Sequence, residues 1–129
     1  MAQRPIFTPK YLLTGASMAT QQIAGPSNIE QVSCISYDIA WTGAPVGTFA
    51  IQVSNTYVPN PSPGNLPLNP GTWTTIPQNV FEGIYPTPAG TPSNGGLDFD
   101  VTGFTWVQLV YTPTSGTGAL TVVVAGKVS

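Results

Sequence analysis

The sequence contains no histidine, the side chain that most often serves as a general base or binds a metal. Serine–histidine and cysteine–histidine nucleophile systems are therefore excluded. The one cysteine, Cys34, cannot form an intrachain disulfide, and without histidine it cannot complete a tetrahedral zinc site. No cation lies near it in the sequence, so Cys34 is expected to pack as a small buried hydrophobe. These absences predict a protein that is not an enzyme and has no cofactor.

Charge is equally scarce, since 6% of the residues are charged and only three of them are basic. Binding a phosphate backbone requires a basic stripe, so we expect no nucleic-acid partner. Few charges also give little repulsion between copies, which favours close packing against other protein. No apolar run is long enough for a transmembrane helix, and Pro5, Pro9 and Lys10 interrupt the N-terminal segment that a signal peptide would need. We therefore expect no membrane partner and synthesis in a cytoplasm.

Carboxylates are the remaining candidates for chemistry. Asp98 and Asp100 stand two residues apart and would share one face of a strand, a spacing that loosely fits an inverting glycosidase. With loop carbonyls they would also offer oxygen ligands to calcium. A solvated polar face explains the same spacing and is favoured, because aspartate is usually exposed.

The glycine-spaced stretch TSGTGALTVVVAG (residues 114–126) raises the alternative of a phosphate-binding loop. Such a loop needs three glycines between a strand and a helix, but Thr121 stands at the third position and a β-branched run follows. Gly116 and Gly118 instead supply residues that accept a positive φ where the chain reverses. We therefore predict a β-hairpin between strands at 105–112 and 119–127.

Two-residue alternation of apolar and polar side chains indicates strands elsewhere in the chain. It runs through residues 35–42, 48–54 and 97–101, whereas residues 105–112 and 119–127 are apolar on both faces and predict central strands. Val32 and Cys34 alternate in the opposite phase to the residues from Ile35 onward, which predicts a β-bulge near Cys34. The side chains predicted to face inward in the first two strands are Ile35, Tyr37, Ile39, Trp41, Phe49, Ile51 and Val53.

The whole pattern predicts an all-β fold, an antiparallel β-sandwich or jelly roll of seven to eight strands. Residues 17–129 form its single domain, and residues 1–16 form an extended N-terminal arm or an edge strand. Two proline-rich segments, 57–72 and 84–96, are predicted to be loops, either contact surfaces or passive connections. The candidate protein-contact residues on the arm and the first loop are Arg4, Ile6, Phe7, Tyr11, Leu12, Leu66 and Leu68.

The aromatic residues suggest a second kind of surface. Trp41 and Trp106 lie in predicted strands, so we expect both in the core. Trp73 follows the proline-rich loop instead, and with Tyr57 and Tyr85 it would form a patch on which sugar rings stack.

Three stretches together carry a family resemblance: DIAWTGAPVGTFAIQVSNTYV, GTWTTIP and FTWVQLVYTPTSGTGALTVVVAGK. Over roughly residues 36–127 this pattern resembles small β-sandwich virion proteins of tailed bacteriophages. The resemblance implies a capsid decoration or cement protein, made in the host cytoplasm and located on the capsid surface. Its implied partners are the major capsid protein and copies of itself, with a homotrimer favoured. The alternative is a carbohydrate-binding or fibre-tip receptor-binding module.

Overall fold

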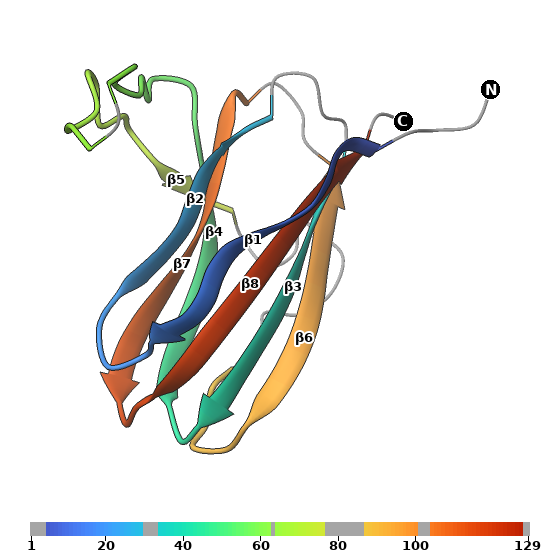
Figure 1. Cartoon of the computed structure of the whole chain (residues 1–129), viewed down its shortest axis with the longest axis vertical. Helices are drawn as coiled ribbons and strands as arrows, with labels where there is room; N and C mark the ends of the chain where they lie inside the picture. The colour runs from blue at the N-terminus through green and yellow to red at the C-terminus, as the bar shows by residue number, and fades with distance from the viewer. Residues whose placement is uncertain (1–4, 30–33, 63, 77–86, 101–103, 128–129) are drawn as a thin grey trace.

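The computed structural model describes residues 5–29, 34–62, 64–76, 87–100 and 104–127. Within these ranges the chain forms eight strands in two antiparallel four-stranded sheets, which pack face to face as a β-sandwich (Figure 1). The predicted fold class is confirmed. In the same ranges no helix is long and apolar enough to cross a membrane.

The strand order is that of a jelly roll. One sheet, sheet A, has the order β1-β8-β3-β6, and the other, sheet B, has the order β2-β7-β4-β5. Successive strands therefore alternate between the sheets, except that β4 and β5 share sheet B. The strand bounds are β1 Pro5–Ser17, β2 Gln22–Asn28, β3 Cys34–Gly43, β4 Val46–Ser54, β5 Thr74–Thr75, β6 Ser93–Asp100, β7 Trp106–Ser115 and β8 Gly118–Lys127.

The core lies between the sheets and follows from the alternation in the sequence. All seven side chains predicted to face inward from residues 35–42 and 48–54 are buried, and Leu97 of β6 joins them. Strands β7 and β8 are central as predicted, since β7 pairs with β2 and β4 while β8 pairs with β1 and β3. Residues 107–111 of β7 are buried on both faces, which explains why all of them except Gln108 have largely apolar side chains.

The predicted hairpin at Gly116–Gly118 is wrong. Strands β7 and β8 lie in different sheets, so the connection between them crosses the sandwich. It packs there against the connection from β3 to β4, with the Ala44 amide donating to the Thr117 carbonyl at 3.0 Å. A Cβ at Gly118 would meet the Thr42 carbonyl oxygen, and one at Gly116 the Ala44 carbonyl oxygen. The glycines serve this close crossing of two backbones, which local turn patterns do not distinguish from a hairpin.

Other boundaries also differ from prediction. β2 was not predicted, because Gly25 and Pro26 interrupt it; an edge strand tolerates both, and its pairing with β7 shifts register around them. β6 begins at Ser93, so the predicted loop 84–96 ends earlier than expected. β3 pairs without any register shift from Cys34 onward, so no bulge is found between Cys34 and Ile35, and residues 30–33 before them lie outside the described residues. Cys34 is half-buried rather than buried.

Candidate functional site

The segment between β4 and β5, residues 55–73, contains the first proline-rich loop and projects beyond the end of the sandwich (Figure 1). Its two ends are held together by hydroxyl groups. The Ser54 hydroxyl accepts hydrogen bonds from the Thr56 and Tyr57 amides at 3.1 and 3.2 Å. The Thr56 hydroxyl in turn accepts one from the Thr72 amide at 2.7 Å. The loop therefore leaves and rejoins the sheet at one braced point.

A short antiparallel bridge holds the middle of the loop. Val58 and Asn69 exchange backbone hydrogen bonds of 2.9 and 3.1 Å. The Asn69 side chain then accepts the Gly71 amide at 2.9 Å, and Gly71 has a φ of +79°. A Cβ at Gly71 would lie 2.9 Å from Tyr57, so only glycine fits this turn.

The tip of the loop carries two exposed leucines. The Asn60 side chain accepts the Ser62 amide at 2.9 Å and donates to the Leu66 carbonyl at 3.1 Å. The side chains of Leu66 and Leu68 remain 86% and 67% exposed. An ordered backbone that presents bare apolar side chains is a preorganised contact surface, because little further entropy is lost on docking. We call Leu66 and Leu68 the leucine tip.

Sequence reasoning selected the two leucines but missed the asparagines that hold them. Asn60 and Asn69 each precede a proline, a dipeptide that favours turn initiation, and each side chain accepts the amide two residues later. This local pattern was the signal available in the sequence.

Aromatic rings gather where the loop meets sheet B. The Tyr57 ring lies 5.7 Å from that of Trp73 and 5.0 Å from that of Trp106, the latter edge to face. The Trp73 indole also donates to the Pro70 carbonyl at 3.0 Å. Two of the three residues predicted for a glycan patch are thus together, and Tyr85 lies outside the described residues. The rings of Tyr57, Trp73 and Trp106 are half-buried, and Tyr57 contacts the other two. They therefore form a small hydrophobic cluster that supports the loop.

The prediction for Trp106 was therefore wrong, whereas that for Trp41 is confirmed. Trp41 is 4% exposed in the core, with its indole donating to the Thr91 carbonyl at 2.9 Å. Trp106 begins β7 at the loop end of the sheet, where the Tyr57 ring contacts it and the indole stays half-buried.

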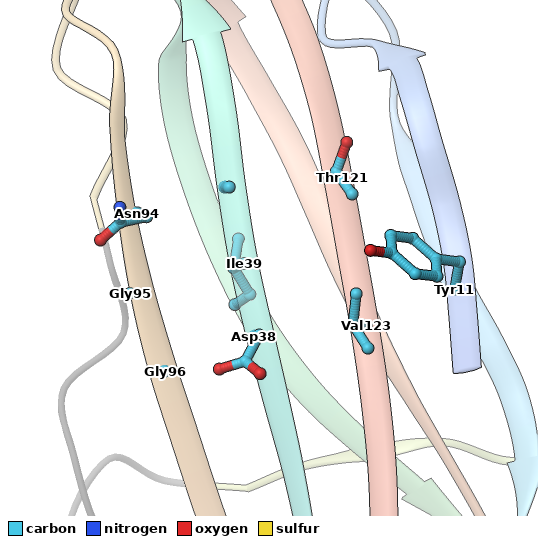
Figure 2. A pocket seen from close by; sticks show the side chains of 9 residues that line it. Tyr11, Asp38, Ile39, Asn94, Gly95, Gly96, Thr121 and Val123 are labelled. Atoms are coloured by element: carbon cyan, nitrogen blue, oxygen red, sulfur yellow. The ribbon is translucent and has the colours of Figure 1, made fainter. Parts of the chain in front are cut away.

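The arm residues fall along the edge strand β1, which pairs with β8. Arg4 and the side chains of Ile6 and Phe7 lie outside the described part of the structure. Tyr11 is 65% exposed on the outer face of sheet A (Figure 2). Leu12, by contrast, is partly buried against the core.

The residue types that bind metals do not gather in the part of the chain that the structure describes. It contains no group of three histidine, cysteine or acidic residues that would hold a metal. The side chains of Asp98 and Asp100 lie outside it, so their roles remain predictions.

No family model and no curated protein sequence matches the chain. Three solved structures show a weak likeness to the chain. The SPBc2 prophage-derived protein YomS is 12% identical, with a TM-score of 0.44 over 93% of this chain and 96% of that one. A chain of infectious bursal disease virus, Gx strain, is 8% identical, with a TM-score of 0.47 over 97% of this chain and 32% of that one. The third is a chain from Bacillus endospore appendages, described as disulfide-linked pili, at 15% identity and a TM-score of 0.37, covering 100% and 93%.

Proposed function

We propose that this protein is a non-enzymatic structural component of a virus particle, a capsid decoration or cement protein that docks on the capsid surface through the leucine tip. The observation that carries the proposal is the braced loop whose Leu66 and Leu68 side chains are 86% and 67% exposed. The sequence resemblance to tailed-phage virion proteins and the jelly-roll strand order, which recurs in viral capsids, support the same role.

Low charge fits contacts of this kind. A decoration protein binds by shape and apolar contact to the major capsid protein and to copies of itself, for which we propose a homotrimer. Such a subunit needs no titratable site. Repetition of the subunit over the capsid lattice strengthens weak contacts through multivalency, so one leucine tip per subunit is enough for stable binding.

The test uses shells of the encoding virus assembled without this protein, to which purified wild-type or L66S/L68S protein is added. Burying a leucine is worth about 1.5–3 kcal/mol, so loss of both should weaken binding by about 100-fold or more. I23S is the matched control, because Ile23 is an exposed apolar residue of sheet B, 46% exposed and remote in sequence from the loop. Unchanged affinity of the double variant would refute docking through the leucine tip, and no wild-type binding would refute the cement role.

The alternative function, a carbohydrate-binding or fibre-tip module, is favoured by the contact between Tyr57 and Trp73. If a glycan binds at this contact, W73A should lose that binding. Light scattering, which measures the oligomer mass, would distinguish the cement protein from the carbohydrate-binding module. A stable trimer favours a preformed cement unit.

A further inference from the structure

A second surface lies on the outer face of sheet A, far in sequence from the leucine tip. Here a shallow groove of about 490 Å³ runs across all four strands, from Tyr11 on β1 to Asn94 on β6 (Figure 2). Its volume lies within the range of small-molecule sites, about 300–1,000 Å³. Nothing in the proposed docking of the loop uses it.

The register of the sheet builds the groove in two rows. In the first row Tyr11 pairs with Val123, Val123 with Asp38, and Asp38 with Gly96. Neighbours in such a row lie on one face of the sheet, so the aromatic ring and the carboxylate stand on either side of the Val123 methyl groups. Gly96 contributes no side chain, and the space beside the Asp38 carboxylate stays open.

The second row lies two residues away along each strand. Thr121 pairs with Ala40, and Ala40 with Asn94. The floor of the groove here is the Ala40 methyl group, with the Thr121 hydroxyl on one side and the Asn94 carboxamide on the other. Figure 2 shows Tyr11 leaning from β1 toward β8, while Asp38 and Asn94 lie on the two strands beyond it.

We propose that this groove binds a neutral oligosaccharide. A sugar ring presents an apolar C–H face and a rim of hydroxyl groups. The exposed Tyr11 ring and the Val123 methyl groups can contact the apolar C–H face. The sugar hydroxyl groups can donate to the Asp38 carboxylate, which only accepts hydrogen bonds. They can also pair with the Asn94 carboxamide, which both donates and accepts.

The same chemistry excludes other ligands. No lysine or arginine lines the groove among the described residues, and Asp38 disfavours phosphate, sulfate or acidic sugars. An apolar ligand would bury the Asp38 carboxylate without a partner, which is costly. An added peptide strand would need a free sheet edge, but β8 and β3, beneath the centre of the groove, are paired on both sides.

The test is an amide-shift NMR titration of the full chain with neutral hexasaccharides (cellohexaose, maltohexaose and N-acetylchitohexaose) and with acidic hexagalacturonate. We expect millimolar or tighter binding of at least one neutral probe and none of the acidic one. Failure of all neutral probes, or preference for hexagalacturonate, would overturn the proposal.

G96V is the sharpest variant. A Cβ at Gly96 would meet nothing closer than 3.5 Å, the Asp38 carboxylate oxygen, and its φ is not positive, so the fold accepts a side chain there. Valine also suits a strand better than glycine. The variant removes no binding group but fills the floor of the groove, so binding should be lost while stability is kept. Retained binding in a folded G96V places the site elsewhere and overturns the proposal.

Three further variants identify the contacts. Y11A should weaken binding by about tenfold and Y11F should not, because the ring face is retained. D38N should weaken it by about tenfold, since hydrogen bonds to a charged acceptor are lost. I23A is the control and should bind like the wild type. Loss of binding in W73A together with full binding in G96V would assign the sugar to the Tyr57–Trp73 cluster and refute the groove. Particle binding is measured separately, so failure of either proposal leaves the other intact.

Discussion

Replacing Tyr111 with phenylalanine should stabilise the protein. The Tyr111 side chain is 1% exposed in the core, and its hydroxyl has no hydrogen-bond partner among the described residues. Its ring packs on Phe49 at 5.0 Å, a contact that phenylalanine keeps. The hydroxyl lies so close to the backbone of Gly47 that a Cβ on this residue would be only 2.6 Å from the Tyr111 hydroxyl oxygen.

The expected gain follows from desolvation. A buried hydroxyl without a partner costs about 1–3 kcal/mol by mutational measurement, so Y111F should raise the free energy of unfolding by about 1–2 kcal/mol. For a domain of this size the melting temperature should rise by about 3–8 °C. Urea denaturation and calorimetry measure both quantities, and Y11F, which removes a hydroxyl from a 65% exposed side chain, should change neither.

Alkaline pH provides a second measure of the same group. Burial raises the pKa of Tyr111 above its ordinary value of 10.0, so the folded state holds this proton more tightly than the unfolded chain. The stability that the protonated Tyr111 gives the folded state is fully present below the pKa of Tyr111 in the unfolded chain. It is lost as the pH rises through the higher pKa of Tyr111 in the folded state. Y111F lacks this loss, so its advantage over the wild type should grow above about pH 10. A variant less stable than the wild type at neutral pH would show that the hydroxyl is satisfied, and would refute the reasoning.

Two further substitutions test the crossing and the loop. G118A should lower the free energy of unfolding by about 1–3 kcal/mol, because its methyl group would meet the Thr42 carbonyl oxygen; an unchanged urea midpoint would show that the two connections separate easily. W73A should lose the indole hydrogen bond to Pro70 and the ring contact with Tyr57, which together are worth about 1–3 kcal/mol. Chymotrypsin should then cut after Leu68 faster than in the wild type, and equal cleavage rates would mean that the cluster does not support the loop.

Much of the fold was predictable because alternation is a local property. Ile35, Tyr37, Ile39 and Trp41 face one side of β3 whatever strand lies beside them, so the core face could be derived before any pairing was known. The same holds for the central position of β7 and β8, because apolar side chains on both faces are typical of strands that have a neighbour on each side.

Pairing was not predictable, because it depends on segments distant in the sequence. The same two glycines suit a hairpin within one sheet and a crossing between two, and only the contact with residues 42–45 distinguishes them. The groove was missed for the same reason. Tyr11, Asp38, Asn94 and Val123 come from four strands, and only the order β1-β8-β3-β6 places them on one surface. The leucine tip, in contrast, is formed within one short segment and was found from its composition.

The pairing of β1 with β8 has a consequence for how the chain folds. These strands lie near opposite ends of the sequence, with Pro5 opposite Lys127, and β8 is also the partner of β3. Sheet A cannot close until residues 118–127 have been synthesised, so β1 must wait without a partner and β3 can pair earlier only with β6. Such long-range topology gives folding times of about milliseconds to seconds and exposes sticky intermediates in the interval. We therefore expect yield in cells to be limited by the rate of folding and to improve at lower temperature or with added chaperones.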